Sequence, residues 1–111
     1  MPTLSDEAMN EVAHFFQVLA EPQRLKILQH LRSQPMRVSE LAQVCGSSVP
    51  NVSRHLAQLA QQGLVHRRAL GVSAYYQVAD PSIYALCDLV CGKLGRRHQL
   101  QAERARQFNP D

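Results

Sequence analysis

The sequence is short of the features that anchor, cross-link or secrete a protein. Its 111 residues contain no tryptophan and three cysteines, and no uninterrupted apolar run approaches the roughly 20 residues that a membrane helix needs. The N-terminus has no basic segment followed by an apolar one, so no secretory signal is expected. An odd number of cysteines without dense spacing excludes a disulfide scaffold and fits reducing surroundings. We therefore expect one cytoplasmic domain over residues 1–111, without membrane contact.

Catalytic signatures are also missing. The sequence has no glycine-rich phosphate loop, no HExxH and no GxSxG, which argues against an enzyme. Positive charge is absent from residues 1–23, whereas residues 24–68 carry seven lysines and arginines against the single acid Glu40. Such a basic block is typical of a surface that binds a polyanion. A solvated surface that is basic by chance fits the charge equally well, so the helix pattern has to decide.

The first 35 residues predict two amphipathic helices. Ser5 can cap the first, because Asp6 and Glu7 then lie in the first turn, where the helix dipole favours negative charge. Pro22 suits the first position of the second helix, which Pro35 closes. The apolar stripe of the first helix is Ala8, Val12, Phe15, Phe16 and Leu19, and the core positions of the second are Leu25, Ile27, Leu28 and Leu31.

A helix-turn-helix is predicted over residues 38–62, with its recognition helix from about Val49 to Gln62. Two short helices joined by a tight glycine-containing turn are typical of this motif. The expected boundary residues are Ser39 as the first cap, Cys45 as the end of that helix, Gly46 in the turn, Ser47 or Ser48 as the second cap, and Gly63 as the stop. The expected core positions are Leu41, Val44 and Cys45, followed by Val52, Leu56 and Leu59.

The spacing of apolar residues changes after the recognition helix. Residues 64–68 and 73–78 are typical of two strands around a turn at residues 70–72, which predicts a β-hairpin, or wing, over residues 64–78. A last helix is expected over residues 81–105, and the polar tail 106–111 is expected to fray. The sequence thus predicts a mainly α winged helix-turn-helix with five helices and a two-stranded wing.

The predicted recognition helix has a polar face suited to reading DNA bases. Asn51, Arg54 and Gln58 lie opposite its core positions, and such side chains match guanine and adenine edges in the major groove. An ordinary solvent-facing helix is the alternative, because amides are common there. The residues expected to bind double-stranded DNA are these three, with Ser53 and His55 on the flanks, Ser48 for a phosphate, and Arg67 and Arg68 of the hairpin for phosphates or the minor groove.

Several motifs resemble the ArsR/SmtB family of transcriptional repressors. The segment LAEPQRLKIL resembles the entry to the family's winged-helix core, and further segments continue the similarity in order over residues 12–95. These further segments are residues 38–42, 52–59, 63–65 and 75–78. The resemblance implies a homodimer with the helices at 1–20 and 81–105 in its interface. It also implies an imperfect palindromic operator and release when an inducer binds.

The family's metal-sensing motifs are not kept. The cysteine-bearing motif Glu-Leu-Cys-Val-Cys-Asp falls on residues 35–40, where both cysteines are absent. The zinc site of the last helix falls on Asp80, Ser82, Lys93 and Arg96. Only Asp80 is kept, where a capping role explains it, and the two basic residues would repel a divalent cation. A zinc sensor of that design is therefore not expected, and no cofactor is required.

Two of the three cysteines are placed to sense a ligand. Cys87 and Cys91 are four residues apart, so both sulfurs lie on one helix face and can share a thiophilic ion. A third sulfur could come from Cys45, the symmetry mate or a small thiol. Three sulfurs suit As(III) or Sb(III), which the resemblance also suggests as inducers. The alternatives are oxidation of the thiols and a role as small hydrophobes, the latter favoured for Cys45.

An interaction module or metal buffer that does not touch DNA is a competing class of function. The basic block and Arg54 argue against it. Within the repressor interpretation, redox sensing, reactive-sulfur sensing and the lack of any cysteine-dependent sensing all stay open.

Overall fold

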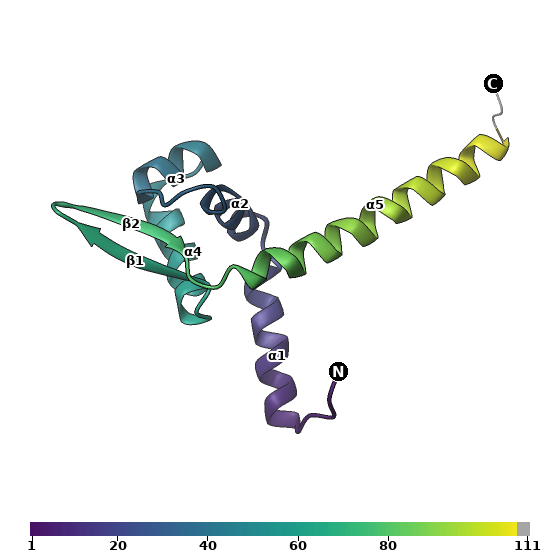
Figure 1. Ribbon diagram of the computed structural model, residues 1–111, viewed down its shortest axis with the longest axis horizontal. Helices are drawn as coiled ribbons and strands as arrows, with labels where there is room; N and C mark the ends of the chain where they lie inside the picture. Colours follow the sequence, from purple (N-terminus) through teal and green to yellow (C-terminus); the bar gives the residue numbers. More distant parts are fainter. Residues whose placement is uncertain (109–111) are drawn as a thin grey trace. The chain divides into compact units, whose positions relative to one another are not determined.

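In a computed structural model that describes residues 1–108, the chain forms five helices and a two-stranded antiparallel hairpin (Figure 1). This confirms the predicted mainly α fold with its two-stranded wing. The residues divide into two units, 1–80 and a second that begins at Pro81. The last helix thus forms a separate unit, and the single domain predicted over residues 1–111 stays a prediction. Among the described residues, no helix is both long and apolar enough to pass through a bilayer.

The first two helices begin at caps that their own sequences supply. Helix α1 spans Asp6–Leu19, and the hydroxyl of Ser5 accepts a hydrogen bond from the backbone N–H of Ala8 at 3.2 Å. Helix α2 spans Pro22–Leu31, and its cap is Glu21. Both starts agree with the prediction, and a proline at the first position of α2 loses no hydrogen bond because that N–H has no partner within the helix.

Helices α3, Val38–Cys45, and α4, Val49–Gln61, form the helix-turn-helix. Gly46 joins them at a φ of 63°. A left-handed residue of this kind favours glycine, because any other side chain would bring its Cβ close to the backbone carbonyl. The predicted motif is therefore confirmed within one residue at the end of α4.

The start of α3 differs from the prediction. Its cap is Arg37, whose backbone N–H donates to the carboxylate of Glu40 at 3.0 Å, rather than Ser39. The guanidinium of Arg37 also lies 3.2 Å from that carboxylate. These contacts hold the pKa of Glu40 below its usual value, the backbone hydrogen bond contributing most. The carboxylate therefore closes the helix start, and the helix begins earlier than a serine cap would allow.

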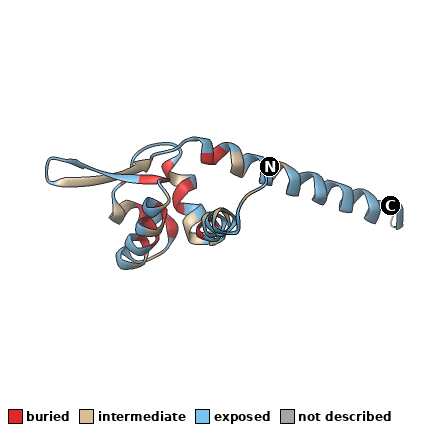
Figure 2. Cartoon of the chain, turned by 90° about the horizontal axis from the view of Figure 1, so that it is seen from below, coloured by how far each residue is buried: buried red, intermediate tan, exposed pale blue. Residues whose placement is uncertain are grey.

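The core of the first unit lies where α2, α3 and α4 meet, and the red segments of these helices in Figure 2 belong to it. The most deeply buried side chains are Ile27, Leu28, Leu41, Val52, Leu56 and Leu59. Two predicted core positions are wrong: Leu25 is 42% exposed and Val44 is 48% exposed. Each lies on the side of its helix, because the inward faces are centred on Ile27, Leu28 and Leu31 in α2 and on Leu41, Ala42 and Cys45 in α3.

The hairpin pairs β1, Val65–Leu70, with β2, Ser73–Val78, in antiparallel register. An isolated bridge ties it to the helix-turn-helix, because Met36 and Tyr76 exchange backbone hydrogen bonds of 3.0 and 2.8 Å. Met36 lies just before α3, so this bridge fixes the wing beside the motif it serves. The hairpin was predicted from two strand-like segments around a turn, whereas the bridge was not predicted.

The second unit is helix α5, Ser82–Phe108. Residues 106–108, predicted to fray with the rest of the tail, are helical, and residues 109–111 lie outside the described part of the chain. Gln, Ala, Glu and Arg dominate the end of α5, and all four are strong helix formers. With no glycine or proline in this stretch, the helix continues past the predicted end at residue 105.

Candidate DNA-binding surface and cysteine pair

Helix α4 begins at an exposed serine. The hydroxyl of Ser48 accepts a hydrogen bond from the backbone N–H of Asn51 at 3.2 Å, so Ser48 rather than Ser47 is the cap. Pro50 lies in the first turn, where no helix hydrogen bond is lost. The helix dipole favours an anion at this end, although Pro50 has no N–H and the N–H of Asn51 is already bonded to Ser48. Ser48 is thus exposed at the positive end of the helix, and its contact with a phosphate stays a prediction.

The side chains of Asn51 and Arg54 are joined in one chain of hydrogen bonds. The amide nitrogen of Asn51 donates to the hydroxyl of Ser47 at 2.8 Å, and the guanidinium of Arg54 donates to the amide oxygen of Asn51. Arg54 is exposed, whereas Asn51 is half-buried. Sequence reasoning missed the role of Ser47, because this residue lies before α4 and the spacing rules of a helix do not extend to it.

The other predicted residues of α4 lie on two flanks. Asn51 and Gln58, seven residues apart, share one flank, and Ser53 lies on the other. Ser53 is exposed and Gln58 is half-buried. The structure thus gathers Ser48, Asn51 and Arg54 in the first half of the helix and places Gln58 two turns after Asn51.

His55 does not belong to this surface. The residue is 5% exposed, because it lies three residues after Val52 and four before Leu59 on the inward face of α4. Its Nδ1 accepts a hydrogen bond from Nε of Arg24 at 3.2 Å, and its Nε2 lies 3.8 Å from a carboxylate oxygen of Glu21. Burial lowers the pKa of His55, and Glu21 partly offsets the effect. The prediction that His55 faces DNA is therefore wrong.

Arg67 and Arg68 are both exposed on β1. They lie opposite Tyr76 and Tyr75 of β2, respectively. Because successive side chains of a strand point to opposite faces, the two arginines project from different faces of the wing. The structure therefore keeps both as exposed cations but does not place them on a single surface.

The three cysteines occupy different environments and are not joined by disulfides. Cys45 is buried in α3, and burial raises the pKa of its thiol. Cys87 is half-buried and Cys91 is exposed, one turn apart on α5. Cys45 therefore resembles a core residue, whereas Cys91 is open to solvent and Cys87 is partly so.

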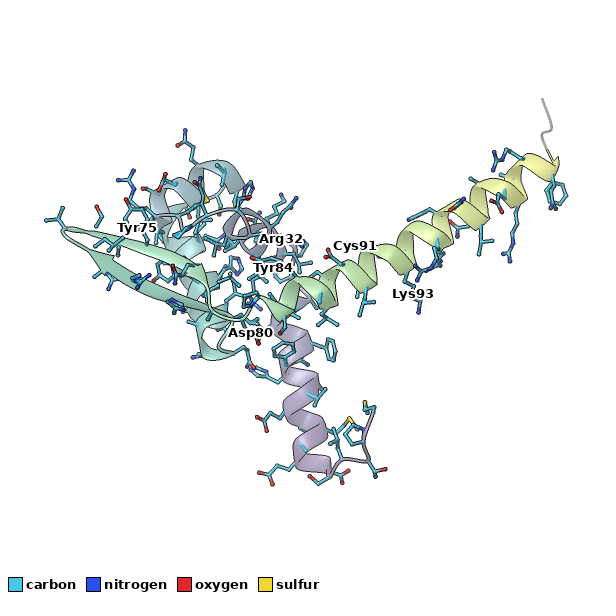
Figure 3. The ribbon with its side chains drawn as sticks, in the orientation of Figure 1. Arg32, Tyr75, Asp80, Tyr84, Cys91 and Lys93 are labelled. Atoms are coloured by element: carbon cyan, nitrogen blue, oxygen red, sulfur yellow. The ribbon has the colours of Figure 1, made fainter. Side chains whose placement is uncertain are left out.

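The basic side chains of α5 would repel a divalent cation. Cys91 and Lys93 project from different sides of the helix (Figure 3). A shallow basic surface on α5 is lined by Lys93, Arg96, Arg97, Leu100, Gln101 and Arg104. Over residues 1–108, no three His, Cys, Asp or Glu side chains come together in a group able to hold a metal ion. A complete site therefore needs ligands beyond those that one copy of the described chain brings together.

Comparison with known proteins identifies a family. The model of the bacterial regulatory protein arsR family matches residues 21–67. The chain is 34% identical over 83 residues to the transcriptional regulator KmtR of Mycobacterium tuberculosis, an alignment covering 75% of this chain and 64% of KmtR. It is 38% identical over 85 residues to NmtR of the same organism, covering 77% and 71% respectively. The chain thus spans slightly under two thirds of KmtR and slightly over two thirds of NmtR.

Solved structures show the same fold. Rv0081 of Mycobacterium tuberculosis superposes with a TM-score of 0.81 and 30% identity, covering 88% of this chain and 99% of that one. The homodimeric winged helix-turn-helix DNA-binding domain of Mb0332 from Mycobacterium bovis gives 0.72 and 29%, covering 88% and 96%. The antimony-specific transcriptional repressor AntR gives 0.73 and 27%, covering 89% and 90%.

Proposed function

The chain belongs to the arsR family of bacterial regulatory proteins, and from this premise we propose that it is a cytoplasmic, homodimeric transcriptional repressor that binds double-stranded DNA. The observation that carries the proposal is the hydrogen-bonded chain of Ser47, Asn51 and Arg54 at the exposed start of α4. Side chains already oriented lose less conformational freedom on binding, so more of their interaction with bases appears as affinity. The relatives named above are transcriptional regulators, in keeping with a chain that is not an enzyme.

A homodimer would present two copies of α4 to an imperfect palindrome, with half-sites about one helical turn apart. Support comes from large apolar side chains exposed on both helices expected at the interface. They are Phe16 in α1, 52% exposed, and Leu89, Val90 and Leu94 in α5, 72%, 51% and 45% exposed. A second copy of the chain would remove this apolar surface from water.

The inducer of this proposal is a thiophilic ion, As(III) or Sb(III), held by Cys87 and Cys91. The exposed and half-buried thiols one turn apart support it, as does the likeness to the antimony-specific repressor AntR. The third sulfur would come from the symmetry mate or from a small thiol. Cys45 is left out, because burial and the raised pKa of its thiol keep it protonated. No resident cofactor is required.

The test of DNA binding starts from duplexes selected out of a random pool by the purified chain. Arg54→Ala is expected to weaken binding to the selected duplex about tenfold or more, because one bidentate base contact is worth roughly 1–3 kcal/mol. Arg106→Ala, which removes the same charge from the last turn of α5, is the matched control. Selection of no preferred sequence, or the absence of a salt-sensitive gel shift, would overturn the repressor proposal.

The test of the inducer titrates the complex with arsenite, antimonite, zinc, cadmium, peroxide and polysulfide in parallel. Release by arsenite or antimonite is expected, and Cys87→Ser and Cys91→Ser should each abolish it, because the remaining thiol cannot complete the site. Cys45→Ala is the matched control and should keep the response. Release by peroxide or polysulfide alone would show that the inducer is an oxidant or a reactive sulfur species rather than a metalloid. Equal responses in all three variants would remove these thiols from the mechanism.

A further inference from the structure

Arg24 joins three parts of the first unit through one side chain. It lies three, four and seven residues before Ile27, Leu28 and Leu31, so it shares the inward face of α2. Its Nε donates a hydrogen bond to Nδ1 of His55 at 3.2 Å, and its Nη1 donates to the carbonyl oxygen of Val18 at 3.1 Å. One guanidinium therefore ties the end of α1 to the middle of α4.

The other ring nitrogen of His55, Nε2, lies near a carboxylate. Glu21 accepts from the backbone N–H of Arg24 at 3.0 Å, and the same carboxylate oxygen lies 3.8 Å from Nε2 of His55. Because Nδ1 accepts from Arg24, the ring proton of the neutral imidazole must sit on Nε2. The buried ring is thus held between a cation at one nitrogen and a carboxylate near the other.

We propose that Arg24 and His55 are positioning residues for DNA binding: their hydrogen bond holds α4 at the corner between α1 and α2, so that Asn51 and Arg54 meet the bases in a fixed orientation. The proposal rests on the DNA-binding function proposed above. His55 immediately follows Arg54 and lies four residues after Asn51, so the ring anchors the part of α4 that carries both. Base contacts need hydrogen-bond geometry, and a small rotation of α4 would misdirect both side chains.

The hydrogen bond from Arg24 to His55 forms only while the imidazole is neutral. A proton on Nδ1 would turn the acceptor into a donor that faces a guanidinium. Among residues 1–108, the charged groups that act on His55 are Glu21, Arg24 and Arg54, with none from α3 or β1. Burial and the two arginines oppose the imidazolium, and only Glu21 favours it. Specific DNA binding should therefore weaken as the pH falls and His55 gains its second proton.

Nitrogen NMR of the full-length free chain tests the hydrogen bond between Arg24 and His55 without DNA. The expected result is a His55 ring protonated at Nε2 and not at Nδ1, with an Nδ1 signal that shifts in Arg24→Gln. A ring protonated at Nδ1 at neutral pH would overturn the proposal whether or not the chain binds DNA.

Two substitutions of His55 then test whether its hydrogen bond with Arg24 affects binding to the selected duplex. His55→Asn keeps an acceptor near the place of Nδ1 but cannot gain charge, so it should retain affinity at neutral pH and lose the weakening at acid pH. His55→Leu fills the space without an acceptor and should bind the selected duplex about tenfold more weakly, while its circular dichroism stays native.

The outcomes separate two failures. If the wild-type chain selects no duplex, the proposed function fails, and the NMR result still decides whether the anchor exists. If the wild-type chain binds a selected duplex and His55→Leu binds it equally well, the positioning role fails alone. An acid weakening that is the same in His55→Asn and the wild-type chain would likewise overturn it.

Discussion

The amide nitrogen of Asn51 donates a hydrogen bond to the hydroxyl of Ser47 at 2.8 Å, although Ser47 lies outside the helix that carries Asn51. The turn before α4 therefore orients a side chain of α4. With its nitrogen held by Ser47, the amide of Asn51 turns its oxygen toward Arg54. The orientation of the two side chains proposed to read bases thus depends on a residue outside their helix.

Ser47→Ala should weaken binding to the selected duplex about threefold to tenfold, the worth of one neutral hydrogen bond. The free amide of Asn51 would then have to be ordered at the moment of binding. Fluorescence anisotropy with labelled duplex measures the change. Ser39→Ala, an exposed serine on α3 that is not the cap, is the control. Unchanged affinity in Ser47→Ala would show that the bond does not survive in the complex.

The free energy of unfolding should rise with pH in the range where an unfolded histidine loses its proton. Burial lowers the pKa of His55 below its usual 6.5 in the folded chain, so the unfolded chain binds more protons in this range. The contribution of His55 is fully present above about pH 6.5 and is lost as the pH falls through the folded pKa.

Urea unfolding at several pH values and one fixed protein concentration measures this effect, because dimerisation would otherwise change the apparent stability. The informative quantity is the difference in the free energy of unfolding between the wild-type chain and His55→Asn at each pH. As the pH falls, the free energy of unfolding of His55→Asn should rise relative to that of the wild-type chain. A difference that is constant with pH would contradict the assigned environment of His55.

At protein concentrations low enough to keep the chain monomeric, the three thiols should react with an alkylating reagent in the order Cys91, Cys87, Cys45. Cys91 is exposed, Cys87 is half-buried, and Cys45 is buried with a raised thiol pKa, so little of it is thiolate. Mass spectrometry of briefly alkylated native chain gives the order, and alkylation in urea shows that all three can react. Rapid labelling of Cys45 in the native chain would contradict its burial.

Arg67→Ala and Arg68→Ala should have unequal effects on DNA binding. The two side chains project from opposite faces of the wing, so one face can approach the duplex while the other turns away. The arginine that reaches a phosphate should lower the slope of log affinity against log salt by about 1 on substitution, and its neighbour should leave the slope unchanged. Equal changes for both would indicate that the wing enters a groove rather than lying along the backbone.

Local patterns were sufficient for the order of the elements. The caps at Ser5 and Ser48, the left-handed Gly46 and the buried face of Val52, Leu56 and Leu59 are where the sequence predicts them. Each depends on residues within one or two turns of one another. The errors at Leu25 and Val44 have a common cause: an apolar residue on the side of a short helix satisfies the helical spacing without reaching the core.

The sequence by itself determined the winged helix-turn-helix and the polar, amide-rich recognition helix, because these follow from neighbours along the chain. The direction of His55 was open to the same local argument, since it completes the spacing of Val52, Leu56 and Leu59, but its polarity favoured the wrong face. Its partner was decided only by the tertiary structure. Arg24 lies 31 residues earlier, and only the packing of α2 against α4 makes a buried imidazole an acceptor for its guanidinium.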